Sequence, residues 1–267
     1  MSLFDVAQVE FERAGHDASD DRPRLLLDGV RVDPAGQDAL TGTAASICSV
    51  NDKTLAPMLA RLDVRTLSIQ EVRATSIDGV QRLGRLRYLA INWATRLSDL
   101  APLTALSKLE VLSLIDTPKA GDLTPLTDLS QLRALEFSGG MWNKNRAQTL
   151  EPLSGLRWLE ELRMTNLAVQ SGGLRPLSAL TALKSLTLTN QFETSDYAYL
   201  SVHLPRAECA RFAPYETMSH NIGGKNIMVT GKRKPFLNSR DPKDAARLQK
   251  YVAAWAVECE RARADLH

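Results

Sequence analysis

The sequence predicts an α/β solenoid, with a parallel β-sheet lining a concave face and short helices or 3-10 turns on the convex face. Three observations support this fold class. A six-residue apolar phrase recurs along the chain, its copies begin at residues 64, 86, 109, 132, 159 and 183, and a Pro-Leu phrase follows several of them. Spacings in this range are typical of chains in which each copy supplies one strand and one helical turn. Stacked copies would bury a continuous core that no single copy could form alone.

The recurring phrase has apolar residues at its first, fourth and sixth positions. Its last two apolar positions alternate with outward-facing residues, as in a strand with one buried side. A weaker seventh copy places Leu204, Ala207 and Cys209 in the same positions. The six stronger copies are VRTLSI, LRYLAI, LEVLSL, LRALEF, LEELRM and LKSLTL. We therefore expect about seven parallel strands, whose intervening residues form a small, mildly polar concave surface.

The Pro-Leu phrase predicts the convex side of each repeat. Asp-Leu-x-Pro-Leu occurs at residues 99–103 and 122–126, and related phrases occur at residues 150–153 and 174–177. Proline is tolerated in the first turn of a helix, where its missing N–H would have no intrahelical partner. Each phrase is therefore expected to open a short helical turn opposite the strand.

A strand core followed by D-L-x-P-L-x-x-L resembles the leucine-rich-repeat family, in particular its bacterial internalin and phosphatase-regulator branch. The resemblance covers about residues 60–210 and implies a protein-binding scaffold with no cofactor. One feature departs from the family pattern, in which an Asn nine positions into the repeat satisfies backbone groups at the turn. Asp116, Asn166 and Asn190 stand one residue earlier and are candidates for part of that role. The ninth positions here are occupied by Val72, Ala94, Thr117, Gly140, Leu167 and Gln191.

The repeat leaves a segment at each end of the chain. We expect an N-terminal cap at residues 1–60, the solenoid at residues 61–212 and a hairpin-helix cap at residues 213–267, because the terminal repeats must have their apolar faces covered.

The first segment is predicted to contain four features: a short amphipathic helix at residues 3–13, a polar loop at residues 16–23, a hairpin turning at Asp28-Gly29 and a strand at residues 46–50.

The last segment is predicted to be irregular at residues 215–221, to turn at residues 222–226 and to form a strand at residues 227–230. A helix is expected from Asp241, a suitable N-cap, with Pro242 in the first turn. Its apolar stripe would dock on the last repeat. The stripe consists of Leu248, Tyr251, Val252, Trp255 and Cys259.

Composition argues against several functional classes. The chain has 33 Lys and Arg against 31 Asp and Glu, so its charge gives no general attraction to nucleic acid or membranes. Neither a signal peptide nor a stretch of transmembrane length is apparent. Three distant cysteines predict a reduced, cytoplasmic protein. The four histidines (His16, His203, His220, His267) are isolated from other metal ligands, and no phosphate-binding loop is present, so we expect no metal, cofactor or catalysis.

The candidate partner-binding residues lie on the strand face and at one edge. Residues 138–149 form the longest connection between copies, and insertions in repeat proteins often mark the binding side. Aromatic and cationic side chains are enriched in binding hot spots. The alternative is that both tryptophans fold back over the turns. The candidates are Tyr88, Ile115, Glu161 and Arg163 on the strand face and Trp93, Met141, Trp142 and Arg146 at the edge.

The leading functional hypothesis is a scaffold that binds another protein, and one specific version of it is an inhibitor or immunity-type protein. The alternative is phosphate or nucleic-acid binding by basic residues near the C-terminus, for which a solvated hairpin is the plainer explanation. These residues are Lys225, Lys232, Arg233 and Lys234, with Arg240 and Lys243 nearby.

Overall fold

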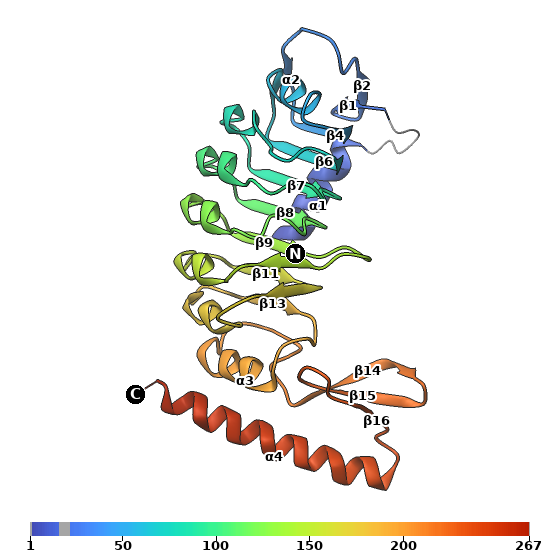
Figure 1. The fold of residues 1–267 in the computed structure, drawn as a ribbon, viewed down its shortest axis with the longest axis vertical. Helices are drawn as coiled ribbons and strands as arrows, with labels where there is room; N and C mark the ends of the chain where they lie inside the picture. Colours follow the sequence, from blue (N-terminus) through green and yellow to red (C-terminus); the bar gives the residue numbers. More distant parts are fainter. Residues whose placement is uncertain (1, 16–21, 267) are drawn as a thin grey trace.

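Stacked strands form the spine of the molecule in the computed structural model, which describes residues 2–15 and 22–266 (Figure 1). Most of the predicted polar loop, together with His16 and His267, lies outside these residues. One nine-stranded sheet has the order β13-β11-β9-β8-β7-β6-β4-β1-β2. Its strands are β1 Arg24–Leu27, β2 Val30–Val32, β4 Ala44–Val50, β6 Thr66–Val72, β7 Tyr88–Asn92, β8 Val111–Ile115, β9 Ala134–Ser138, β11 Glu161–Met164 and β13 Ser185–Leu188.

The six strong copies pair in parallel and in register. Leu67 pairs with Leu89, Leu89 with Leu112, and the ladder continues through the fourth position of each later copy to Leu186. These leucines are buried in one continuous core. Burial of one leucine side chain contributes about 1.5–3 kcal/mol to stability. Because each copy contacts only the copies on either side of it, this burial stabilises mainly its direct neighbours.

The convex side consists of 3-10 helices, as predicted. Proline stands in the first turn of each helix from η2 to η5, and the leucine that follows it is buried. The helices are η1 Val80–Arg82, η2 Ala101–Ala105, η3 Thr124–Asp128, η4 Glu151–Gly155 and η5 Arg175–Ala179.

At the N-terminal end, β4 pairs in parallel with β6 and extends the repeat stack by one strand. The predicted hairpin is present: β1 and β2 pair around Asp28 and Gly29, which both have positive φ, as a tight two-residue hairpin turn requires. The remaining elements here are α2 Leu55–Leu59 and the parallel pair of β3 Leu40–Thr41 with β5 Leu62–Asp63.

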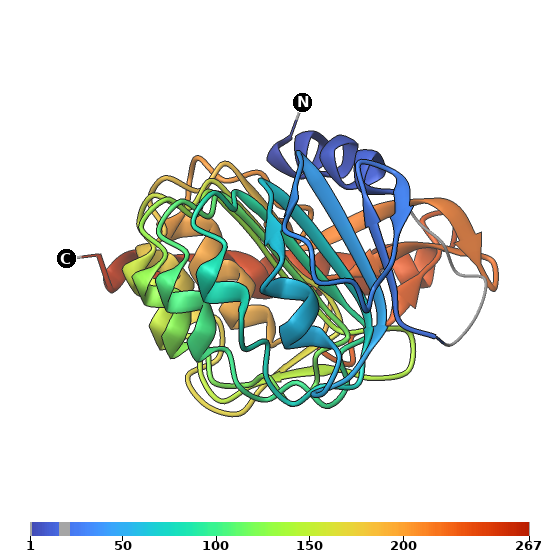
Figure 2. The same ribbon diagram turned by 90° about the horizontal axis from the view of Figure 1, so that it is seen from above.

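The predicted N-terminal helix is present as α1 (Leu3–Ala14), but it does not cap the end of the stack. It lies on the face of the sheet opposite the 3-10 helices (Figure 2). Its first turn reaches β11, where the Leu3 amide donates to Glu161, and its C-cap Gly15 lies against Gly29. A capping box closes the start of the helix, because Ser2 and Asp5 exchange side-chain-to-backbone hydrogen bonds.

The C-terminal end differs from the prediction in two places. The seventh copy forms no strand, and Glu208 makes only an isolated bridge to Ser185. Residues 215–221, predicted to be irregular, belong to β14 (Tyr215–Ile222), which pairs with β15 (Lys225–Val229). The strand β15 pairs in turn with β16 (Phe236–Leu237). The reason is the turn at Gly223 and Gly224, whose positive φ angles close a hairpin.

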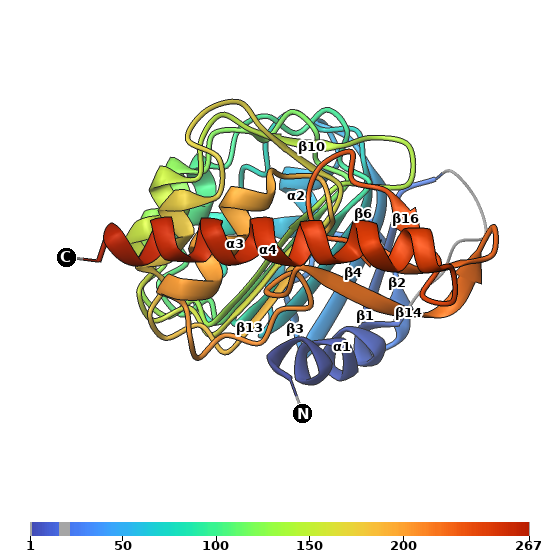
Figure 3. The same ribbon diagram turned by 90° about the horizontal axis from the view of Figure 1, so that it is seen from below.

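Two helices complete this end. α3 (Thr194–His203) follows the last repeat, and α4 (Pro242–Ala264) packs across it (Figure 3). The predicted N-cap is confirmed, since the Asp241 carboxylate accepts the Lys243 amide at 2.8 Å. Of the predicted stripe, Trp255 and Cys259 are buried.

Candidate protein-binding surfaces

A ladder of left-handed residues marks the edge of the sheet where the parallel strands end. Ser49, Glu71, Trp93, Asp116 and Asn166 each follow the regular part of a strand with φ between 46° and 57°. Asp and Asn tolerate this conformation better than other residues with a side chain. Trp93 does not share that tolerance, and its indole is nevertheless 54% exposed.

The inserted loop after β9 presents two more large apolar side chains at the same edge. Met141 is 85% exposed and Trp142 is 88% exposed. The loop between β9 and β10 (Asn145–Ala147) extends beyond the neighbouring turns (Figure 1). Within the sheet β7 and β9 are separated only by β8, so the backbones that carry Trp93 and the loop are about 10 Å apart. We call Trp93, Met141 and Trp142 the indole edge.

The base of this loop is firmly held. The Gly139 amide donates to Thr165 O at 2.8 Å, and the Asn166 side-chain amide donates to Gly140 O at 2.8 Å. Gly140 approaches Asp116 so closely that a Cβ there would lie 2.6 Å from the Asp116 carboxyl carbon. The exposed tip is therefore carried on a fixed base.

Asn145 lies where the chain rejoins the stack, and its side-chain amide bonds to the backbone at the turn after β8. It is fully buried, accepts the Thr117 amide at 2.8 Å and donates to Leu114 O at 3.3 Å. Asn190 does similar work at the C-terminal end, where it bonds to Val229 O and to the Gly231 amide. Asn166 and Asn190 thus bond to backbone groups, as predicted, whereas the buried Asp116 Oδ1 has no hydrogen-bond partner among the described residues. Asn145 was missed because its partners lie 28 and 31 residues away.

The concave face is covered in part by α1. Phe4 and Ala7 are buried against Val111 and Ala134, with Tyr88 packed beside them. Burial raises the pKa of the Tyr88 phenol above its usual value, and the carboxylates of Glu110 and Glu10 add to the shift. Tyr88, predicted as a partner contact, therefore already contacts a segment of its own chain.

The charged pair at the other end of this face also contacts α1. The Glu161 carboxylate accepts the Leu3 amide at 2.6 Å, and the Arg163 guanidinium lies 4.1 Å from the centre of the Phe4 ring. Sequence reasoning identified both residues but missed their partner. A signal was available in the spacing of Phe4, Ala7 and Phe11, which places three apolar side chains on one helical face.

A groove of about 560 Å³ lies between α1 and the strands. Ile115 and the polar residues Gln70, Asn92 and Glu136 are part of its lining. The Asn92 Oδ1 atom is buried, and the described residues offer it no hydrogen-bond partner. Helix and sheet are therefore in incomplete contact.

The basic residues near the C-terminus do not converge on one point. Lys232 lies 4.0 Å from the Glu193 carboxylate, and the Lys234 ammonium lies 5.5 Å from the centre of the Tyr251 ring. Lys225 and Arg233 are exposed. Of the four predicted phosphate ligands, two thus have partners within the chain.

Arg146, which was predicted to bind a partner protein at the edge, is exposed on β10.

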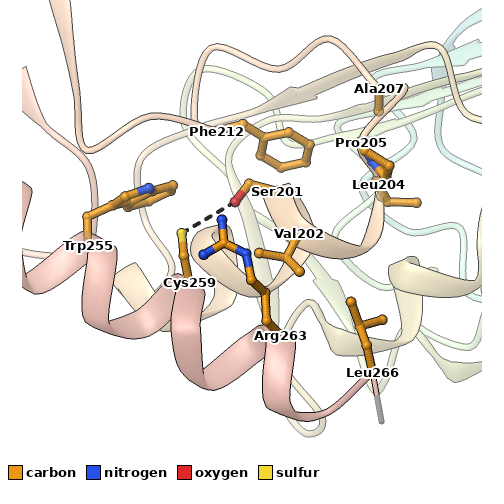
Figure 4. A pocket seen from close by; sticks show the side chains of 10 residues that line it. All are labelled: Ser201, Val202, Leu204, Pro205, Ala207, Phe212, Trp255, Cys259, Arg263 and Leu266. Atoms are coloured by element: carbon orange, nitrogen blue, oxygen red, sulfur yellow. Dashed lines mark hydrogen bonds between the residues drawn. The ribbon is translucent and has the colours of Figure 1, made fainter.

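A second groove, of about 720 Å³, lies beside the C-terminal helix (Figure 4). Ser201 points toward Cys259, with 3.9 Å between the hydroxyl oxygen and the sulfur. Among the described residues that line it there is neither a histidine nor a carboxylate to activate either group as a base. Within residues 2–15 and 22–266, no three potential ligands gather as a metal site would require. No helix in this part of the chain combines the length and apolarity needed to cross a bilayer.

The chain resembles several solved structures. No protein-family model and no curated protein matches the chain. Solved structures that resemble it include internalin C2 of Listeria monocytogenes, with 19% identity over 76% of this chain and 80% of that one and a TM-score of 0.47. An internalin (inlF) of the same organism has 17% identity over 59% and 69% of the two chains, with a TM-score of 0.31. TLR13, solved in complex with ssRNA13, has 22% identity over 58% of this chain and 22% of its own, with a TM-score of 0.40. These neighbours are leucine-rich-repeat proteins. The fold class of this chain rests on its own parallel sheet and short convex helices.

Proposed function

We propose that this chain is a non-catalytic scaffold that binds another protein through the indole edge and the adjoining concave face, and that it acts as an inhibitor or immunity-type protein. The observation that carries the proposal is the exposure of Trp93. A left-handed backbone costs an L-residue about 1–2 kcal/mol, and the exposed indole recovers little of this by burial. The same φ occurs at Ser49, Glu71, Asp116 and Asn166, but of the five residues Trp93 alone is exposed, so its side chain rather than its backbone distinguishes it.

The neighbouring residues strengthen this assignment. Three large apolar side chains are exposed at one edge of the sheet. Aromatic residues and arginine are enriched among the residues that contribute most to binding in protein interfaces. Arg146 supplies the cation from β10. On the concave strands beside this edge, the Ser113 hydroxyl donates to the Glu136 carboxylate at 3.0 Å, but no histidine is among the described residues that line the groove there. Binding is therefore the function that the site supports best.

The test is affinity capture from the native lysate with wild type and with a Trp93→Ala/Trp142→Ala double variant. The matched control is Ile222→Ala/Val257→Ala, which removes two exposed apolar side chains elsewhere. The proposal expects a protein retained by wild type and by the control and lost with the double variant. Equal capture by all three would contradict it.

The basic residues make a distinct prediction, so the two hypotheses can be separated. Binding of nucleic acid through Lys225, Lys232, Arg233 and Lys234 would weaken steeply as salt concentration rises. Binding through the indole edge should depend only weakly on salt. The cytoplasmic, reduced setting indicated by the three cysteines stays a prediction.

Trp93→Asn offers a sharper check of the strain argument. Asparagine tolerates left-handed φ, so this variant should be no less stable than wild type while it loses partner binding. A substantial fall in its melting temperature would mean that the indole contributes packing and that Trp93 is structural.

A further inference from the structure

The helix α1 is held on the concave face as a small, separate unit. Phe4 and Ala7 form a cluster with Val111 and Ala134 that is distinct from the continuous leucine core. The strands beneath α1 are fixed by their own ladder and by the leucines on their other side. The sheet therefore does not need α1 to complete its core.

The face contacts features that many amphipathic helices share. Glu161 accepts an amide from the first turn of α1, one of the donors that every helix leaves without an intrahelical partner. Its negative charge also complements the positive end of the helix dipole. Arg163 covers an aromatic ring in the same turn, a contact that a cation makes with any exposed aromatic face. These contacts select a helix start followed by an apolar stripe.

The fit of α1 is incomplete. A groove of about 560 Å³ remains beside it, and the buried Asn92 Oδ1 in its lining has no partner among the described residues. Val9, in the middle of the helix, is 47% exposed and is not among the residues that line the groove. A helix with larger side chains on its inner face, or with a donor for Asn92, would make more contacts here than α1 does.

We propose that the concave face is a receptor for an amphipathic helix of a partner protein and that α1 is its internal competitor. This inference rests on the proposed protein-binding function and specifies the chemistry of the partner. The partner helix carries apolar residues at the spacing of Phe4, Ala7 and Phe11, with an aromatic residue in its first turn. A linked segment competes at an effective concentration on the order of millimolar, so weakly bound helices are excluded.

The experiment removes α1 from the face without changing any residue of the face. Val9→Pro breaks the helix from its exposed side, whereas Val9→Ala preserves it and is the matched control. The probe is a synthetic peptide of residues 2–15 with a fluorophore at its C-terminus, and binding is measured by anisotropy. Because an occupied face reduces apparent affinity, Val9→Pro should bind the peptide at least about tenfold more tightly than wild type or Val9→Ala.

Two further variants locate the binding. The peptide with Phe4→Glu should not bind, because its first apolar contact is lost. Adding Arg163→Ala to the Val9→Pro protein should reduce binding, since the cation over the ring is removed. A peptide that binds the Arg163→Ala protein just as tightly is bound elsewhere, and the inference is then overturned.

Folding of each variant is verified by circular dichroism and thermal melting. A folded Val9→Pro protein that binds the peptide no more tightly than Val9→Ala overturns the inference. If Val9→Pro does not fold, Phe4→Ala is the second variant and should show a smaller increase. An unchanged affinity in folded Phe4→Ala overturns the inference equally.

The peptide assay does not involve the indole edge, so the two proposals can fail separately. Capture that depends on Trp93 and Trp142, combined with no peptide binding, keeps the scaffold and rejects the helix receptor. Peptide binding that responds to Val9→Pro, combined with capture that does not depend on either tryptophan, keeps the helix receptor and rejects the indole edge as the binding site.

Discussion

The two terminal helices both cover apolar surface, but they are attached in different ways. α4 has 23 residues, and its Trp255 and Cys259 belong to the continuous core. α1 has 12 residues, and its Phe4 and Ala7 belong to a small separate cluster. Both helices have an N-cap residue and an apolar stripe. The stripe alone therefore does not distinguish a helix that is part of the core from one that lies on a finished sheet face. The difference lies beneath them. α4 packs on α3 and β16, whereas α1 lies on a sheet whose leucines are already buried on the other side.

The largest expected effect comes from removing the side chain that joins α4 to the core. Trp255→Ala should lower the free energy of unfolding by about 3 kcal/mol or more, because it leaves a cavity between α4 and α3. Val257→Ala, on the exposed side of the same helix, should change it by no more than about 0.5 kcal/mol. Urea denaturation measures both. A small loss of stability for Trp255→Ala would mean that α4, like α1, is only weakly attached to the core.

Tyr197 in α3 tests the same end of the molecule by pH. Burial raises the pKa of its phenol from 10.0 to about 12. Because the folded state holds the proton more tightly than the unfolded state, this contribution is complete below pH 10 and is lost as pH rises toward 12. The loss should be about 2–3 kcal/mol. Tyr197→Phe should remove this pH dependence and lower stability at neutral pH, because the amides of Gln191 and Phe192 lose their acceptor.

Phe4→Ala tests the attachment of α1. We expect a loss of at most about 1–2 kcal/mol in global stability, since only the small cluster is disturbed. Hydrogen exchange should become faster in α1 while the amides of β7 and β8 stay protected, as expected for local opening. A loss as large as that of Trp255→Ala would show that α1 is part of the core, and the comparison would fail.

The smallest expected effect is acid loosening of α1. Hydrogen bonds from the Ser2 backbone and hydroxyl lower the pKa of Asp5 below 3.8. A lowered pKa in the folded state means that the stabilisation is present above pH 3.8 and is lost as pH falls through the lowered value. Protection factors in α1, which correct for the slower intrinsic exchange in acid, should therefore fall below about pH 4. Asp5→Asn should show lower protection factors already at neutral pH and little further change in acid.

Much of the fold could be predicted because each repeat is specified locally. The leucine positions, the Pro-Leu turns and the Asp241 cap all depend on residues close together in sequence, and all are present in the structure. The position of α1 could not be predicted, because its contacts join Leu3 to Glu161 across 158 residues. The strand β14 was missed because its polar sequence carries no alternation, and its pairing is set by the glycine turn that follows.

The candidate site divides along the same line. The edge position of Trp93 and the inserted loop followed from the repeat period. The left-handed backbone at Trp93 did not, because φ at a ladder position is imposed by the neighbouring strands rather than by the tryptophan itself.

The anchored loop has an evolutionary consequence. Gly139 and Asn145 fix the two ends of the excursion at neighbouring points of the stack, and the chain rejoins the ladder in register on either side. The side chains from Met141 to Lys144 can thus change without disturbing the leucine core, whereas Gly140 is fixed by its close approach to Asp116. Under the proposed function, such a module would let a lineage exchange its target specificity while it inherits the same scaffold.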